Sequence, residues 1–126
     1  MPLAAGYEIN VSCPNIAAGG AAMGSTPEGA SSVMAACRKV TDKPLFVKMA
    51  PVNVAEIAER LERRRADGLS AINSIQGMAI DVRTRKSRVA KPKGGLSGPL
   101  CHHIAVRMVW EVAQAVDIPI NGVAVS

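Results

Sequence analysis

The sequence predicts an α/β fold made of parallel βαβ units. Short runs of apolar and β-branched residues alternate along the chain with longer stretches of helical periodicity, and this alternation is typical of a parallel sheet. The composition agrees with a packed domain, because 48% of the 126 residues are hydrophobic and 20% are charged. We therefore expect one domain, or part of one, with four strands and three helices in alternation.

The four expected strands are short and are bounded by residues that interrupt helices. Pro44 and Pro119 stand just before the second and fourth strands, where an extended residue is favoured. The expected strands cover residues 7–12, 45–49, 68–72 and 118–122.

The helices are expected from the spacing of their apolar residues. Ile57 and Leu61 lie one turn apart, and Thr26 before Pro27 is a typical helix start with a capping hydroxyl. Two further apolar stripes are Val33, Cys37 and Val40, and Ile104, Met108, Val112 and Val116. The expected helices cover residues 27–40, 54–65 and 99–116, and a long basic loop is expected before the last one.

Two architectures fit this alternation, and the periodicity does not choose between them. The chain can form an open, doubly wound sheet or a portion of a closed (β/α)8 barrel. Both architectures bind ligands at the carboxyl ends of their strands. The residues that follow each strand are therefore the place to look for chemistry.

Charge and cysteine content exclude several classes of protein. The net charge is +5, but Tyr7, Phe46 and Trp110 are too scattered to stack nucleic-acid bases, so no nucleic-acid partner is expected. Cys13, Cys37 and Cys101 show no CxxC spacing, which argues against a disulfide framework or a zinc site and favours a reducing cytoplasm.

Membrane and metal sites are also not expected. No apolar run approaches the ~20 residues of a membrane-spanning helix, and the first residues do not read as an export signal. His102 and His103 are adjacent, so their side chains point in different directions and do not form a metal-binding pair.

The first expected strand is followed by two amides that flank a thiol. Asn10 and Asn15 offer both hydrogen-bond donors and acceptors, which suits an amide-rich ring such as a pyrimidine. Cys13 between them can act as a nucleophile or proton acceptor, or it can be an inert core residue. Both interpretations of the thiol stay open on spacing alone.

Polar residues also stand at the ends of the next two strands. Lys48 closes an apolar strand and either contacts an anionic or electron-rich ligand or extends its ammonium to water. Asn73 and Ser74 follow the third strand as ligand contacts or turn residues. The glycines of the segment 94–99 precede a helix, where backbone N–H groups can approach a phosphate or flavin, although a flexible turn is also compatible.

Taken together, these segments resemble the class 1 dihydroorotate dehydrogenases, most closely class 1B. The resemblance spans about residues 7–122 and rests on Asn-Val-Ser-Cys-Pro-Asn at 10–15, Val-Lys at 47–48, Ile-Asn-Ser at 72–74 and Gly-Gly-Leu-Ser-Gly-Pro at 94–99. It implies a (β/α)8 TIM-type barrel with FMN at its mouth, and oxidation of dihydroorotate to orotate in cytoplasmic pyrimidine biosynthesis.

The resemblance also assigns roles to individual residues. Cys13 would be the catalytic base that removes a proton from the substrate, and hydride would pass to the flavin. Asn10 would contact both substrate and FMN. The other implied substrate contacts are Asn15, Asn73 and Ser74, and the other implied FMN contacts are Lys48, Ile72 and Gly98.

The length implies that only part of such a barrel is present. A complete barrel takes ~250 residues, so residues 1–126 are expected to form a single partial domain, about half of the barrel, from roughly strand four to strand seven. Ala124 and Val125 replace a glycine pair of the family, and a valine there hinders backbone approach to the FMN phosphate.

The resemblance also implies partners for the protein, and two alternative functions remain open. The resemblance implies an iron–sulfur flavoprotein subunit as electron acceptor, and a homo-oligomer is expected. One alternative is a non-catalytic half-barrel that associates with itself through its open strand edges. The other is a domain like that of dihydropyrimidine dehydrogenase, which acts on a related ring.

Overall fold

A parallel sheet of four strands forms the centre of the molecule. The computed structural model describes residues 3–12 and 23–123. The strands are β1 (Tyr7–Asn10), β2 (Leu45–Lys48), β3 (Gly68–Ala71) and β8 (Ile120–Gly122), and they lie in the order β1-β2-β3-β8 with every neighbouring pair parallel. The prediction of an α/β fold with a parallel sheet is confirmed.

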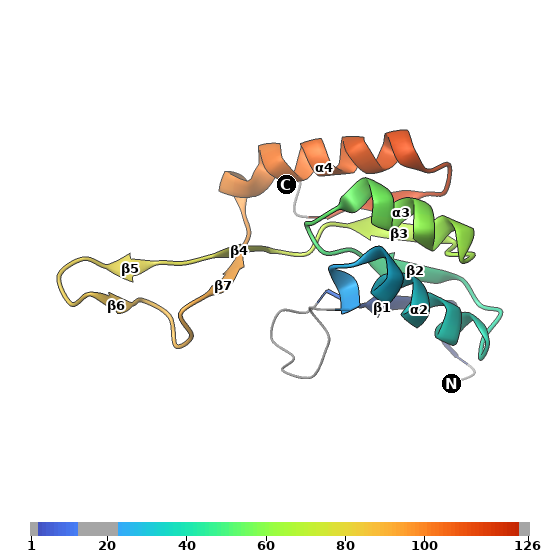
Figure 1. Ribbon diagram of the computed structural model, residues 1–126, viewed down its shortest axis with the longest axis horizontal. Coiled ribbons are helices and arrows are strands. Elements are labelled where there is room, and N and C mark those ends of the chain that lie inside the picture. The colour runs from blue at the N-terminus through green and yellow to red at the C-terminus, as the bar shows by residue number, and fades with distance from the viewer. Residues whose placement is uncertain (1–2, 13–22, 124–126) are drawn as a thin grey trace.

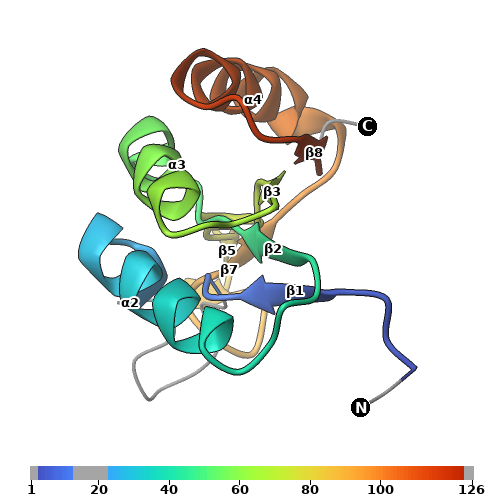
Figure 2. The ribbon, with the colours of Figure 1, turned by 90° about the vertical axis from the view of Figure 1, so that its right-hand side faces the viewer.

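Three helices connect the strands and cover the same face of the sheet (Figure 2). They are α2 (Pro27–Arg38), α3 (Val54–Arg63) and α4 (His102–Ala115), and a 3-10 turn, η1 (Pro99–Cys101), leads into α4. The expected start of α2 is confirmed, since the Gly29 N–H donates to the Thr26 hydroxyl at 3.1 Å. Each helix ends one to two residues earlier than the periodicity suggests.

The core lies between these helices and the sheet, and Ile57 and Leu61 of α3 are fully buried as predicted. The apolar stripes predicted for the other two helices are only partly confirmed. Val40 lies beyond the end of α2 and is 83% exposed, so the buried face of that helix is Ala30, Ser31 and Met34. The buried residues of α4 are Ala105 and Val112, while Ile104 and Trp110 are exposed.

The segment between β3 and α4 is not the irregular loop that the sequence suggested. It forms two antiparallel pairs, β4 (Ile75–Gly77) with β7 (Gly94–Leu96) and β5 (Ile80–Asp81) with β6 (Lys86–Ser87). Figure 1 shows this arm, residues 75–96, extending away from the sheet and helices. At its tip, Asp81 Oδ1 accepts hydrogen bonds from Arg83 and Thr84, and Arg85 adopts a φ of 57°.

The two faces of the sheet differ in chemistry. The face toward the helices carries buried apolar residues of β2 and β3. The opposite face carries a polar row, which strand register places at one level across all four strands: Asn10, Lys48, Ser70 and Asn121. Within this face Ser70 Oγ donates to the Glu8 carboxylate at 2.5 Å. Asn10 and Asn121 at the two ends of this row are exposed and Lys48 is half-buried, so a ligand can reach these three residues, whereas Ser70 is fully buried.

Candidate functional site

The carboxyl ends of β1, β2 and β3 meet in a hydrogen-bonded cluster centred on Ser12. The Ser12 hydroxyl lies 3.2 Å from the Asn10 side-chain oxygen and 3.2 Å from the Lys48 carbonyl oxygen. The Ser12 N–H also donates to Asn10 Oδ1, at 3.3 Å. Because Asn10 ends β1 and Lys48 ends β2, this one side chain joins two strand ends.

Asn73 brings the end of β3 into the same cluster. Its amide nitrogen donates to the Ser12 hydroxyl at 2.8 Å and lies 3.4 Å from Asn10 Oδ1. Its amide oxygen accepts from the Ser74 N–H at 2.9 Å, and its own N–H donates to the Met49 carbonyl at 2.9 Å. The prediction that the polar residues after these strands lie together is confirmed for Asn10 and Asn73.

Ser12 is the participant that the sequence analysis did not select. It lies inside the Asn-Val-Ser-Cys-Pro-Asn segment and is only 6% exposed. Buried hydroxyls need hydrogen-bond partners, and this one finds them on all three neighbouring segments. The available signal was a small polar residue two positions after a strand, between two residues already regarded as candidates.

Lys48 lies on the same face as Asn10, at the same level of the sheet. Its side chain is half-buried, and among the described residues its ammonium has no hydrogen-bond or ion-pair partner. A half-buried ammonium at a strand end attracts anionic or electron-rich groups. This geometry is compatible with both predicted roles of Lys48, contact with a ligand and extension of the ammonium to water.

Two further predicted contacts lie around this cluster. Ile72 is 1% exposed and donates its N–H to Val123 O at 3.2 Å, so a main-chain contact from Ile72 to a ligand would come from its carbonyl oxygen. Gly98 has a φ of 98°, which favours glycine, and no atom lies within 4 Å of the position of a Cβ there. Within the described residues no hydrogen bond links Gly98 to the Ser12 cluster.

The arm contributes to the same region through β7. A side chain at Gly95 would collide with the Ser74 hydroxyl, so the absence of a Cβ lets the arm pack against the end of β3. Two predicted site residues, Cys13 and Asn15, lie outside the described residues, as do Ala124 and Val125.

A pocket of about 350 Å³ opens at these strand ends. This volume is in the usual range for small-molecule sites. Its lining mixes hydroxyl, amide and apolar groups, which suits a small polar ring. The lining residues are Ser12, Ser25, Ala50, Pro51, Val52, Ser74, Ile75 and Gln76.

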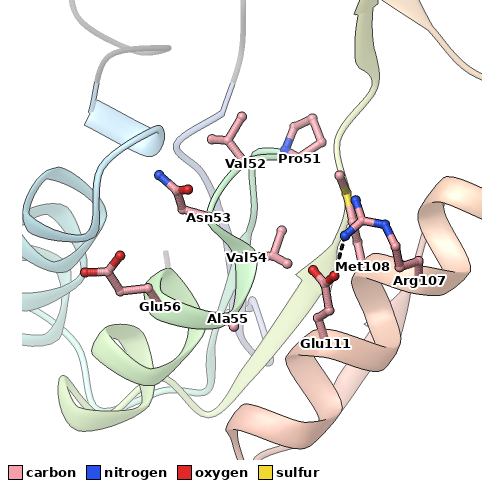
Figure 3. Close-up of a pocket in the computed structure, with 9 residues that line it drawn as sticks. All are labelled: Pro51, Val52, Asn53, Val54, Ala55, Glu56, Arg107, Met108 and Glu111. Atoms are coloured by element: carbon pink, nitrogen blue, oxygen red, sulfur yellow. Dashed lines mark hydrogen bonds and ion pairs between the residues drawn. The ribbon is translucent and has the colours of Figure 1, made fainter.

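A second pocket, of about 430 Å³, lies between the start of α3 and the middle of α4 (Figure 3). Its cation, Arg107, forms an ion pair with Glu111 one turn further along α4. Glu56 adds a second carboxylate to the lining. One amide, Asn53, and no hydroxyl lines this pocket, whereas the pocket at the strand ends is lined by three serines, although Asn10 and Asn73 are not part of its lining.

Metal and membrane features were searched over residues 3–12 and 23–123. No group of three or more His, Cys, Asp or Glu side chains in this part of the chain is placed to hold a metal ion. The rings of His102 and His103 stack edge to face, with centroids 5.4 Å apart. None of the helices in these residues has the length and apolar character needed to cross a membrane.

Comparison with known proteins identifies the family. The sequence profile described as dihydroorotate dehydrogenase matches residues 1–124. The chain belongs to the dihydroorotate dehydrogenase family. Members of this family are flavoproteins with a TIM-barrel fold, and the order of strands and helices in this chain agrees with such a barrel.

Several relatives of this chain carry the name dihydroorotate dehydrogenase B (NAD(+)), catalytic subunit. The protein from Pelobacter propionicus is 46% identical over 125 residues, which is 98% of this chain and 41% of that protein. The protein from Trichlorobacter lovleyi matches to the same extent. The protein from Anoxybacillus flavithermus is 47% identical over 117 residues, 91% of this chain and 38% of its own length. The chain thus spans about two fifths of these relatives.

Proposed function

We propose that this chain forms about half of a class 1B dihydroorotate dehydrogenase barrel, with residues 1–126 as a single partial domain covering roughly strands four to seven. Three observations support the proposal. The strands are parallel and consecutive in the sheet, the helices lie on one face only, and the other face carries the polar row. A closed barrel has this arrangement, with helices outside and strand ends at the mouth.

The proposed reaction is the oxidation of dihydroorotate to orotate. Bound FMN would supply the electron acceptor for a hydride from one ring carbon. Cys13 would take the proton from the adjacent carbon onto its sulfur. A thiol has an ordinary pKa near 8.5, so its environment must favour the thiolate for this role. The observation that carries the proposal is the Asn10–Ser12–Asn73 cluster, whose Ser12 directly precedes Cys13 in the sequence.

The amides of this cluster have the capacity to bind a pyrimidine. The Asn10 side-chain nitrogen donates to none of the described residues, so both of its hydrogens are available to ring carbonyls or a carboxylate. Asn73 Oδ1 accepts one hydrogen bond, from Ser74, and retains a second lone pair for a ring N–H. Asn15 and the Ser74 hydroxyl would complete the substrate contacts.

The described residues also fit FMN. The Lys48 ammonium would lie against the flavin ring, together with the Asn10 amide. The Ile72 carbonyl would accept from the ring edge, and the open space at Gly98 would admit the cofactor to the backbone. These groups come from four separate segments, all at or beyond strand ends or before a helix.

The relatives are named as catalytic subunits, which supports a second subunit as partner. We propose an iron–sulfur flavoprotein for that role, and a homo-oligomer of the catalytic chain. A second candidate function is a non-catalytic half-barrel that self-associates. The uncovered polar row and the edge strands β1 and β8 favour this candidate, since unpaired strand edges invite pairing.

Flavin binding tests the proposal and separates the two candidates. The purified chain should quench FMN fluorescence on titration and, under anaerobic conditions, dihydroorotate should bleach the bound flavin. Replacement Cys13→Ala should leave FMN binding unchanged and slow the bleaching. Dihydrouracil serves as the control substrate, because bleaching by it would indicate a dihydropyrimidine dehydrogenase instead. A colourless protein that elutes as a dimer or larger species would support the non-catalytic candidate.

A further inference from the structure

We infer that Ser12 is a positioning residue whose hydroxyl fixes the orientation of the Asn10 and Asn73 amides. The inference rests on the proposed function, because those two amides are the groups proposed to hold the pyrimidine. Ser12 itself is 6% exposed, and its hydroxyl is bonded within the cluster. Although Ser12 lines the pocket at the strand ends, its hydroxyl is already engaged within the cluster, so the role inferred for it is to orient its neighbours.

Hydrogen-bond counting explains how one hydroxyl controls two amides. A serine hydroxyl donates one hydrogen and accepts through two lone pairs. The oxygen accepts from Asn73 Nδ2 at 2.8 Å, the shortest bond that it makes. Its single hydrogen points toward Asn10 Oδ1 or the Lys48 carbonyl, each 3.2 Å away. The hydroxyl oxygen thus fixes the Asn73 nitrogen, and the Asn10 oxygen is held by the Ser12 N–H at 3.3 Å as well as by the hydroxyl nearby.

The consequence is a defined pattern of donors and acceptors at the strand ends. Asn10 must direct its oxygen toward Ser12, so its NH2 group faces outward as a pure donor. Asn73 directs its nitrogen toward Ser12 and its oxygen toward the Ser74 N–H, so its amide does not flip. A ring with carbonyls, or a carboxylate, meets the donor of Asn10, and this pattern disfavours ligands that lack acceptors there.

The backbone around Ser12 is held firmly enough for this role. Gly24 packs against the Val11 carbonyl, and a Cβ on Gly24 would collide with it. The same Cβ would lie 3.2 Å from the Ser12 Cα. The segment before α2 therefore packs closely against residues 11 and 12. This packing keeps the Ser12 hydroxyl between the ends of β1 and β2.

The test compares two serine replacements in the full chain. Ser12→Ala removes the positioning hydroxyl. Ser31→Ala is the matched control, because Ser31 is 5% exposed and its hydroxyl accepts from Arg64 Nε at 3.0 Å, on the helix side of the sheet. Two readouts are used: the side-chain amide signal of Asn73 in a ¹H–¹⁵N spectrum, assigned by its loss in Asn73→Ala, and the Kd for orotate of the FMN-loaded protein.

Ser12→Ala should move the Asn73 side-chain signal and raise the orotate Kd about tenfold, as the loss of one buried hydrogen bond predicts. Ser31→Ala should change neither, and Ser12→Thr, which keeps the hydroxyl, should restore the signal. An unmoved Asn73 signal in Ser12→Ala overturns the inference, and so does an equal effect of Ser31→Ala. Failure of the unaltered protein to bind FMN overturns the proposed function, and the amide signal then decides the inference alone.

Discussion

A polar cluster lies at each end of the strands of the parallel sheet, and we call these ends the amino edge and the carboxyl edge. The two clusters differ in how many of their hydrogen-bonding groups are paired. At the amino edge, the Arg38 guanidinium donates to the carbonyls of Lys43 (3.0 Å) and Arg65 (2.8 Å) and forms an ion pair with Asp67. The Asp67 carboxylate also accepts the Leu45 N–H at 2.8 Å. This cluster ties the end of α2 to the starts of β2 and β3.

At the carboxyl edge, the Ser12 cluster leaves capacity unused. The Asn10 NH2 group and the Lys48 ammonium have no partner among the described residues. The two terminal nitrogens of Arg38 are engaged, whereas its Nε is buried without a partner among the described residues. In barrels of this type the carboxyl ends bind ligands and the amino ends contribute stability. The difference is one of access: the unpaired donors of Asn10 and Lys48 are exposed or half-buried and can meet a ligand, whereas the unpaired Arg38 Nε is buried within the fold.

The largest expected effect on stability comes from Arg38→Ala. The change removes an ion pair and several carbonyl contacts at once and leaves the Asp67 carboxylate without its cation. We expect a loss of about 2–4 kcal/mol in the free energy of unfolding, measured by urea denaturation. FMN affinity of the folded fraction should not change, because the amino edge lies at the opposite end of the strands.

The control for this variant is Arg63→Ala. Arg63 forms an exposed i,i+4 pair with Glu59, and its side chain is 70% exposed. Such pairs contribute about 0.5 kcal/mol or less. Equal losses of unfolding free energy in the two variants would contradict the view that the Arg38 cluster stabilises the fold.

The second expected effect is on ligand binding, at the other edge. Asn73→Ala removes both the bond to Ser12 and the proposed substrate contact, so the orotate Kd should rise roughly 30-fold, which corresponds to about 2 kcal/mol. Isothermal titration of the FMN-loaded protein measures it. Gln114→Ala, which removes an exposed amide from the outer surface of α4, should leave the Kd unchanged.

The strands and helices of the main sheet could be predicted because their patterns reflect burial. Ile57 and Leu61 repeat at one turn and are both buried. The arm could not be predicted in this way. Its strands are two to three residues long, and both residues of β6 are exposed, so no face alternates between core and solvent. The pairing of β4 with β7 joins residues about 20 positions apart, such as Ile75 with Leu96, while β5 and β6 pair locally but are only two residues long.

The site was predictable to the extent that topology alone determines it. Parallel strands bring their carboxyl ends together, so Asn10 and Asn73 were expected to meet and do so. Ser12 was missed because its importance comes from partners 36 and 61 residues away, which no local pattern reveals. That the Lys48 ammonium has no partner among residues 3–12 and 23–123 likewise depends on the positions of charged side chains in three dimensions.

The smallest expected effect is a pH dependence confined to the amino edge. The Leu45 N–H bond, together with the Arg38 guanidinium, lowers the pKa of Asp67 below 3.8. A lowered folded-state pKa means that the carboxylate stabilises the fold above the unfolded value and that this contribution is lost as the pH falls through the folded value. Since the Asp67 side chain is 48% exposed, solvent screening limits the contribution to at most about 1 kcal/mol.

The variant Asp67→Asn isolates this effect. Its amide oxygen can still accept from the Leu45 N–H, but it carries no charge for Arg38 and does not titrate near pH 4. Urea denaturation from pH 7 to pH 2 should show the unaltered protein more stable above pH 4, with the two curves converging as the pH falls below the folded pKa of Asp67. A gap that stays constant down to pH 2 would assign the stabilisation to packing and not to the charge. The amino edge would then resemble the carboxyl edge, where neutral hydrogen bonds carry the structure.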